Sequence, residues 1–334
     1  MQIKKVLVTG GAGYVGSVLV PKLLKADFEV TVLDLYLYGD TLAAVKNDPK
    51  LHEIKGDLRD KKVVHDALQN IDAVIHLACI SNDPSFELNP NLGKSINYDA
   101  SIQLFDLAKQ IGVKRFIYAS SSSVYGVKEE EKVTENLSLE PLTDYSRYKA
   151  LCERYLLPLN SDDFTVLVLR PATVCGYSPR LRLDLTVNIL TCHAIEKGVI
   201  TVFGGEQARP NIHIEDMTDL YVQTLSFPKE QIAGKVYNAG YENYPLNEIA
   251  AMTKKIVGEH VTITKQDTAD KRSYRVDSSK IKQELNFSAK RTVEDAIEDL
   301  VNAFKGNLIP EALSNPRYYN IKTMQKYILK NENR

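Results

Sequence analysis

The most constraining feature of this sequence is a glycine-rich turn close to its N-terminus. The turn follows an apolar run, 6–8, and precedes a segment, 14–26, whose apolar residues recur at helical spacing. A strand, a tight turn and a helix in this order bring bare backbone and the free N–H groups of a helix N-terminus up to a pyrophosphate. The turn satisfies the dinucleotide-binding patterns G-x-G-x-x-G and G-x-x-G-x-x-G through Gly10, Gly11, Gly13 and Gly16.

An acidic residue stands at the distance from this turn that a dinucleotide site requires. The run 29–33 predicts a second strand, and Asp34 follows it directly. A carboxylate there can accept hydrogen bonds from both ribose hydroxyls of an adenosine, and it repels the 2′-phosphate of NADP. We therefore expect NAD as the cofactor. The alternative interpretation is a glycine turn in an α/β sheet of another kind.

Length and charge limit the classes of protein to be considered. The 334 residues allow about two domains, and 42 basic against 43 acidic side chains give no reason to expect a nucleic acid or an anionic membrane as partner. No apolar stretch approaches the length of a membrane span, and no signal peptide precedes the first predicted strand. Four widely separated cysteines fit reduced thiols in a cytoplasm, and six scattered histidines predict no metal site.

The first half of the chain alternates strands and helices. Further strands are predicted at 51–55, 72–78, 114–119 and 164–169, and helices near 60–69, 91–110 and 144–158. Near-continuous Val, Ile and Leu strands separated by helices indicate a parallel sheet covered on both faces, which is a doubly wound α/β Rossmann sheet. His76 lies within one of these apolar strands, and we interpret it as a core histidine.

Beyond Arg170 prolines and glycines become more frequent and the elements shorter. Helices are predicted near 184–197, 214–225, 247–257 and 292–304, and the tail after Lys305 shows no legible pattern. We predict a smaller α/β substrate-binding lobe beside the Rossmann sheet. The expected NAD-binding domain is 1–170, with about 206–240 returning to it, and the expected lobe is 171–205 and 241–334.

One pair of side chains after the fifth predicted strand can carry acid/base chemistry. Tyr145 and Lys149 are four residues apart and share a face of a helix, and the serine run 120–123 ends the strand before them. An ammonium beside a phenol predicts a lowered pKa for Tyr145 and an acid/base role near neutral pH. Tyr318 and Lys322 repeat the spacing without such a strand, and we interpret them as solvated surface.

The order of these motifs resembles that of the extended short-chain dehydrogenases/reductases. Within them the chain is similar to the sugar-nucleotide epimerases and dehydratases typified by UDP-glucose 4-epimerase. The motifs that carry the resemblance are Thr9-Gly-x-x-Gly-x-x-Gly16, Gly56-Asp57-Leu58, His76-Leu-Ala78, Asn97, Ser120-Ser-Ser-Ser-Val-Tyr-Gly126, Tyr145-x-x-x-Lys149 and Arg170-Pro-Ala-Thr-Val-x-Gly176. The resemblance implies a retained NAD, transient oxidation of a hexose C4 hydroxyl to a ketone, and a homodimer formed through the long helices.

The resemblance also implies roles for individual residues. Ser121 is expected to bind O4, Tyr145 to act as the base, and Lys149 to orient the nicotinamide ribose. The expected NAD contacts are Gly10, Gly13, Tyr14, Val15, Gly16, Asp34, Asp57, Leu58, Leu77, Ala78, Asn97, Tyr145 and Lys149. The candidate contacts of the nucleotide-sugar substrate are Ser81, Ser122, Ser123, Arg182, Asn188, Arg209 and Arg272, with Arg209 expected at the substrate pyrophosphate and Arg180 as a further candidate.

The residues beside Ser121 bear on the type of reaction. Dehydratases and decarboxylases of the family place an acidic residue there, whereas this chain has Ser122 and Ser123, which have no useful basicity near pH 7. This disfavours 4,6-dehydration and leaves 4-epimerisation or net 4-oxidation. The epimerases usually have an Asn where Ala172 or Thr173 falls, and the segment resembles more closely a bacterial branch that includes GDP-heptose 4-dehydrogenases and other enzymes of surface-polysaccharide synthesis.

We therefore expect an NAD-dependent epimerase that oxidises C4 of an NDP-hexose transiently. The alternative is an NDP-sugar 4-dehydrogenase acting on a heptose or hexose, with 4,6-dehydration disfavoured. A third hypothesis, a non-catalytic NAD(H)-binding module, does not account for the presence of Ser121, Tyr145 and Lys149 together.

Overall fold

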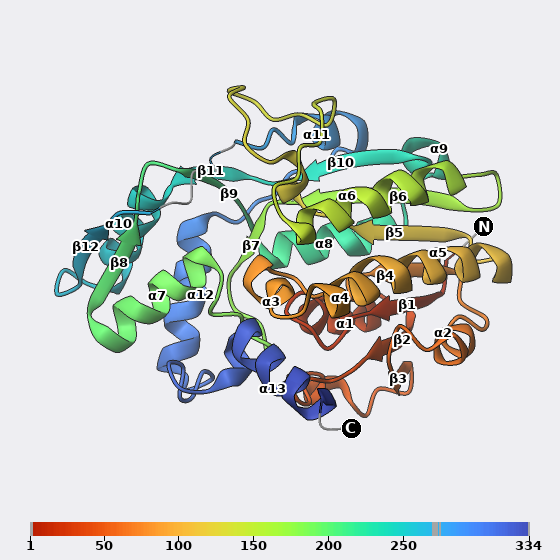
Figure 1. The fold of residues 1–334 in the computed structure, drawn as a ribbon, viewed down its shortest axis with the longest axis horizontal. Coiled ribbons are helices and arrows are strands. Elements are labelled where there is room, and N and C mark those ends of the chain that lie inside the picture. The colour runs from red at the N-terminus through yellow and green to blue at the C-terminus, as the bar shows by residue number, and fades with distance from the viewer. Residues whose placement is uncertain (1–2, 269–272, 274, 333–334) are drawn as a thin grey trace.

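A computed structural model of the chain describes residues 3–268, 273 and 275–332. Its centre is a seven-stranded sheet in the order β3-β2-β1-β4-β5-β6-β10, in which every neighbouring pair is parallel (Figure 1). The strands are β1 (Lys5–Thr9), β2 (Glu29–Asp34), β3 (Leu51–Lys55), β4 (Ala73–His76), β5 (Arg115–Ala119), β6 (Thr165–Pro171) and β10 (Lys235–Ala239). The predicted doubly wound α/β fold is confirmed, and the seventh strand is one that the sequence did not reveal.

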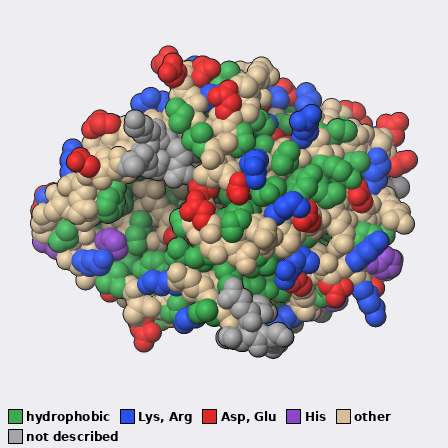
Figure 2. Space-filling model, in the orientation of Figure 1, with side chains coloured by type: hydrophobic (Ala, Val, Ile, Leu, Met, Phe, Trp, Pro, Cys, Tyr) green, Lys and Arg blue, Asp and Glu red, His purple; other side chains and the backbone are tan. Residues whose placement is uncertain are grey.

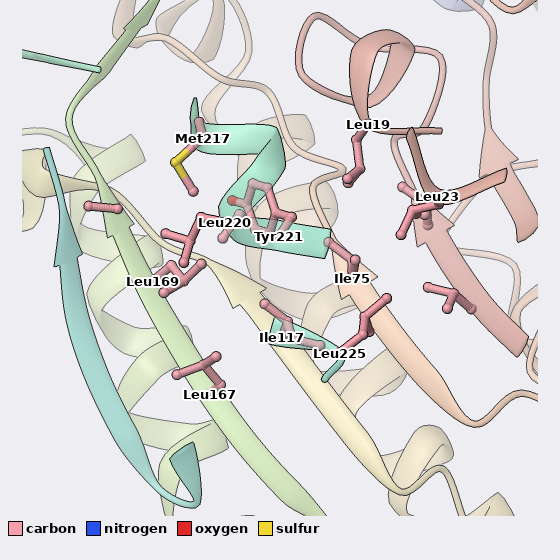
Figure 3. Packing of buried hydrophobic residues seen from close by; sticks show 14 of the residues in the cluster. Leu19, Leu23, Ile75, Ile117, Leu167, Leu169, Met217, Leu220, Tyr221 and Leu225 are labelled. Carbon is pink, nitrogen blue, oxygen red and sulfur yellow. The ribbon is translucent and has the colours of Figure 1, made fainter. Parts of the chain in front are cut away.

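Helices cover both faces of this sheet. One face carries α1 (Gly16–Lys25) and α8 (Ile214–Thr224), and the other carries α2 (Lys61–Ala67), α5 (Ala100–Ile111) and α6 (Asp144–Leu156). Alternate side chains of a strand point to opposite faces, so Val6 and Val8 join the apolar cluster under α1 and α8, while Leu7 joins the other. Figure 3 shows the first cluster, where Leu19 of α1 and Leu220 of α8 lie over the strands.

A long helical run connects β4 to β5. It consists of α4 (Pro90–Lys94), a π-helical turn (Ser95–Asp99) and α5, and it confirms the helix predicted near 91–110. The short helix α3 (Asp83–Glu87) precedes it. The predicted core position of His76 is also confirmed, because its ring is buried between the hydroxyls of Thr9 and Ser101.

Smaller sheets and a group of helices lie beyond the carboxyl ends of the large sheet, on the left of Figure 1. One sheet has the order β11-β9-β7, and the other pairs β12 with β8. These strands are β7 (Thr173–Cys175), β8 (Val199–Phe203), β9 (Ala208–His213), β11 (Glu242–Pro245) and β12 (Thr262–Gln266). Three helices, α7 (Thr186–Lys197), α10 (Leu246–Val257) and α12 (Val293–Lys305), pack on one another here. The predicted domain boundaries stay a prediction.

Two short helices, α9 (Lys229–Ile232) and α11 (Ser279–Leu285), flank β10 in the chain, and α13 (Asn320–Glu332) ends it. Helix α13 packs against α3. The sequence gave no prediction for this tail, although Ile321, Met324 and Ile328 recur at helical spacing.

The interpretation of Tyr318 and Lys322 as a solvated pair is wrong for the tyrosine. Tyr318 is 1% exposed and packs in an apolar cluster with Tyr14 and Leu181, whereas Lys322 is exposed. Basic and acidic side chains are interspersed over the face shown in Figure 2, in keeping with the near-zero net charge. Among the described residues no helix is long and apolar enough to cross a membrane.

Candidate active site

A cavity of about 460 Å³ opens at the carboxyl ends of the large sheet. Its walls come from the turn between β1 and α1, the segments that follow β2, β4 and β5, the start of α6, the loop after β7, and α13. Ligands of open α/β sheets bind at this edge, where the strand order reverses between β1 and β4. A cavity of this size suits a small-molecule site.

The glycine turn forms the floor of the cavity because its backbone passes too close to its neighbours for side chains. Gly10 has φ +75°, and a Cβ on it would lie 2.7 Å from the backbone nitrogen of Ala78. A Cβ on Gly16 would lie 2.5 Å from the carbonyl oxygen of Gly10. The first turn of α1 has neither a side-chain cap nor an acidic residue. The positive end of this helix is therefore available to a phosphate.

Asp34 is held in a fixed orientation at the end of β2. Its Oδ2 accepts from the backbone nitrogen of Ala12 at 3.0 Å, and its Oδ1 accepts from that of Tyr36 at 2.8 Å. Burial raises the pKa of the carboxyl, against the opposing effect of these hydrogen bonds. Each oxygen keeps further acceptor capacity, which fits the ribose hydroxyls of an adenosine.

Asp57 lines the same part of the cavity and pairs with Arg59, whose Nη2 lies 2.5 Å from its Oδ2. Burial by itself would raise the pKa of Asp57, but hydrogen bonds from Arg59 lower it. The remaining predicted contacts of the adenosine and nicotinamide halves also line the cavity; they are Gly13, Tyr14, Val15, Leu58, Leu77 and Ala78. Together these residues fit a dinucleotide.

The three predicted catalytic side chains meet at the cavity wall beyond β5. Helix α6 begins with a capping box between Thr143 and Ser146, which fixes its N-terminus beside the serine run. Tyr145 is thereby brought to the same cavity wall as Ser121, which interacts with the phenol and lowers its pKa. Lys149 is 3% exposed, and its Nζ donates a hydrogen bond to the backbone carbonyl oxygen of Ala119 at 2.6 Å.

The expected lowering of the Tyr145 pKa is wrong for the chain by itself. Burial raises the pKa of the phenol, and the hydrogen bond from Ser121 and the charge of Arg182 oppose this only in part. Lys149 directs its ammonium at a backbone carbonyl, so it does not offset the desolvation of the phenol. Ionisation of Tyr145 therefore requires a further stabilising charge or a bound hydroxyl that donates to it.

A buried ion pair lies behind the serine run and was not recognised in the sequence. Arg170 Nη2 contacts Glu153 Oε2 at 2.6 Å, and Ser120 Oγ donates to Glu153 Oε1. Arg170 Nη1 also donates to the hydroxyl of Tyr125 at 2.8 Å. The pair ties α6 to the ends of β5 and β6. An acid four residues after Lys149 was the signal that could have revealed it.

The predicted substrate contacts that line the cavity are Ser81, Ser122, Ser123, Arg182 and Arg209. Arg182 is not an uncompensated charge, because its Nε lies 3.0 Å from Oδ1 of Asp184. Arg272 lies outside the described residues.

Two predicted contacts do not reach the cavity wall. Asn97 is buried in the π-helical turn, where its side chain accepts from the nitrogen of Ile80 at 2.8 Å and donates to its oxygen at 2.9 Å. Asn188 accepts from the nitrogen of Gly176 at 3.0 Å and donates to the oxygen of Arg182 at 2.9 Å. Both amides are used to hold loops that form the wall, so the expectation of direct ligand contact is corrected for both.

Other cavity residues were missed because they come from distant or featureless segments. Tyr38 follows β2 in a polar loop, and Asn320, Met324 and Tyr327 lie on α13. No sequence motif marks them. The amphipathic pattern of the tail could have predicted a helix but not its place over the cavity.

Comparison with known proteins agrees with this geometry. A family model described as "NAD dependent epimerase/dehydratase family" matches residues 6–240. A UDP-glucose 4-epimerase of Lactobacillus helveticus is 30% identical over 88% of this chain and 94% of its own. UDP-glucuronic acid decarboxylase 1 of Arabidopsis thaliana is 28% identical over 92% of this chain and 71% of its own. The structure of a UDP-glucuronic acid 4-epimerase from Bacillus cereus, in complex with UDP-glucuronic acid and NAD, is 28% identical, with a TM-score of 0.82 over 91% of this chain and 99% of that one.

Proposed function

This chain belongs to the NAD dependent epimerase/dehydratase family, and from that premise we propose that it is a nucleotide-sugar 4-epimerase. Its substrate is an NDP-hexose whose C4 hydroxyl is oxidised transiently. The observation that carries the proposal is that Ser121, Tyr145 and Lys149 line the same cavity wall, with Lys149 buried one helical turn from Tyr145. The UDP-sugar 4-epimerases among the similar proteins support it.

NAD, on which the family depends, would supply when bound a hydride acceptor that becomes a hydride donor once it is reduced. The residues present fit this cofactor. The glycine turn leaves no room for side chains at Gly10 and Gly16, and the uncapped start of α1 suits a pyrophosphate. Asp34, fixed by two backbone nitrogens, suits the adenosine ribose.

Tyr145 and Ser121 divide the handling of the substrate hydroxyl between them. Ser121 holds O4 by a hydrogen bond, and the phenolate oxygen of Tyr145 takes the proton from O4 and later returns it. Because burial raises the pKa of Tyr145, the phenol keeps its proton firmly until a positive charge lies near. Lys149, on the same face of α6, donates to the backbone carbonyl of Ala119 and in this arrangement does not supply that charge.

Dehydration is disfavoured by what lies beside Ser121. Removal of the C5 proton requires a base, and the cavity wall has the hydroxyls of Ser122 and Ser123 at this place. Ser123 Oγ is 2.9 Å from Ser121 Oγ, so it serves to orient that hydroxyl. The same absence of an acid in these two positions counts against decarboxylation.

The test is a panel of UDP-, GDP-, dTDP- and CDP-hexoses followed by NMR. We expect inversion at C4 of one of them without net growth of the NADH absorbance band. Accumulation of NADH with a released keto sugar would identify a 4-dehydrogenase instead, and loss of the C6 hydroxyl would identify a dehydratase.

The assignment of Tyr145 is tested by Tyr145→Phe. The phenylalanine cannot exchange a proton, so we expect kcat to fall by about 100-fold or more while the NAD content stays unchanged. Tyr148→Phe is the matched control, since Tyr148 lies on the same helix, stacks on Phe86 and does not line the cavity. Full activity of Tyr145→Phe would contradict the mechanism.

We also propose that residues 171–205 and 241–334 form the substrate-binding lobe.

We propose in addition that the enzyme is a homodimer. The long helices α5 and α6 pack side by side on one face of the sheet, and Tyr155 of α6 is 37% exposed there. Light scattering should give twice the mass of the chain; the mass of a single chain would reject the dimer.

A further inference from the structure

The loop after β7 packs against the phosphate-binding end of α1. Ser178 Oγ donates to the carbonyl oxygen of Tyr14 at 2.7 Å and lies 2.8 Å from Ser17 Oγ, and the backbone nitrogen of Arg180 lies 3.4 Å from the same hydroxyl. These contacts join residues more than 160 positions apart in the sequence. They place Arg180 beside the first turn of α1.

The Arg180 side chain is 2% exposed and lines the cavity. Its guanidinium carbon lies 3.5 Å from the centroid of the Tyr38 ring, and Nη2 donates to Oδ1 of Asn320. Asn320 in turn donates from Nδ2 to Ser81 Oγ at 2.9 Å. The guanidinium is thus stacked on one side and anchored at one nitrogen by the C-terminal helix.

Two other nitrogens of this guanidinium are left without partners. Nε and Nη1 are buried and have no hydrogen-bond acceptor at bonding geometry among the residues that the structure describes. A buried cation with unused donors is unfavourable unless an anion completes its shell. A guanidinium fork matches the paired oxygens of a phosphate.

The carboxylates nearest to Arg180 are already engaged elsewhere. Asp184 pairs with Arg182. Asp34 accepts hydrogen bonds from the backbone nitrogens of Ala12 and Tyr36. Burial lowers the pKa of Arg180 to about 10, against the opposing effects of Tyr38 and Asp184. The positive end of α1 adds to the attraction for an anion at this place.

We propose that Arg180 binds the pyrophosphate of NAD from the lobe side of the cavity. The start of α1 offers backbone N–H groups to one side of this anion, and Arg180 offers Nε and Nη1 to the other. The loop that carries Arg180 contacts Tyr14 and Ser17 at the start of α1, which favours the dinucleotide over the diphosphate of the nucleotide sugar. The proposal rests on the NAD dependence of the family and does not depend on the outcome at C4.

The proposal also gives α13 a role in holding the cofactor. Asn320 fixes one end of the guanidinium, so the last helix of the chain positions a phosphate ligand that comes from the loop after β7. Asn320 is therefore a positioning residue, and Arg180 is the binding residue.

The test is titration calorimetry of Arg180→Gln with NAD and, separately, with UDP. Loss of charged hydrogen bonds to the pyrophosphate should weaken NAD binding by about 10- to 100-fold and leave the affinity for UDP unchanged. Arg147→Gln is the matched control, because Arg147 also lies over a tyrosine ring, that of Tyr148, but does not line the cavity. Its affinity for NAD should equal that of the wild type.

Weakened UDP binding with unchanged NAD binding would overturn the proposal and assign Arg180 to the nucleotide sugar. Unchanged binding of both ligands would overturn it as well. If Arg180→Gln does not fold, as judged by circular dichroism, the affinity of Asn320→Ala for NAD tests the proposal instead. That variant keeps the charge and loses the anchor, so a several-fold weaker affinity for NAD supports the proposal and an unchanged affinity overturns it.

Discussion

Replacement of Arg170 by methionine should destabilise the protein by about 3–5 kcal/mol, because it leaves Glu153 buried without a counter-charge. The side chains of the two residues are 6% and 2% exposed. The guanidinium contacts the carboxylate at 3.1 and 3.2 Å through Nε and at 2.6 Å through Nη2. Water cannot replace these contacts at such burial, so the free-energy cost of desolvating the carboxylate is no longer offset.

The double variant Arg170→Met/Glu153→Met separates the charge effect from the loss of packing. It removes both charges and keeps comparable volume, so it should be more stable than Arg170→Met alone by about 2 kcal/mol. The remaining cost reflects the lost partners of Ser120 and Tyr125. Urea unfolding with linear extrapolation measures each free energy of unfolding.

The exposed pair of Lys255 and Glu294, 3.2 Å apart, is the control for this cycle. Its coupling energy should be indistinguishable from zero, since solvent screens it. Strictly additive costs for Arg170→Met and Glu153→Met would refute the reasoning, because they would mean that neither charge depends on the other.

Two further predictions concern the strand ends that carry the cofactor cavity. Burial lowers the pKa of His76 to about 3, below its unfolded value near 6.5, so the stability it contributes is present above pH 6.5 and is lost as the pH falls toward 3. Between pH 7 and 5 the free energy of unfolding of the wild type, measured in urea, should fall by about 2 kcal/mol more than that of His76→Asn. Equal decreases would contradict a buried neutral His76 ring. Gly16→Ala places a Cβ 2.5 Å from the carbonyl oxygen of Gly10, so NAD should no longer co-purify; a normal NAD content, measured after acid release, would show that the turn can shift.

The sequence was most informative where an element and its chemistry are local. The glycine turn, Asp34 and the helix that carries Tyr145 and Lys149 each follow from a few adjacent residues. Their juxtaposition then follows from the topology of a parallel sheet, whose strand ends share one edge. The structure brings all of these residues to one cavity for that reason.

The sequence was least informative where a contact joins distant segments. Arg180 reaches Tyr38 and Asn320, which are about 140 residues away on either side, and no spacing rule connects them. Asn97 and Asn188 were expected to contact ligands because of their position in the motifs, yet each satisfies a neighbouring backbone instead. Polar side chains near a site are often used for its architecture.

Retention of the cofactor connects the proposed reaction with the proposed role of Arg180. A dinucleotide held between α1 on one side and Arg180 and α13 on the other leaves slowly, since the loop after β7 and the C-terminal helix must both move. If the reduced cofactor stayed bound, the ketone in the same cavity would accept the hydride back at C4, which would complete an epimerisation. A 4-dehydrogenase must exchange its cofactor in every cycle, so slow release of the cofactor would not favour its reaction. Arg180→Gln weakens the proposed contact with the cofactor, so it should increase the fraction of turnovers that end in released keto sugar and NADH. If this fraction equals that of the wild type, retention of the cofactor does not decide the outcome at C4.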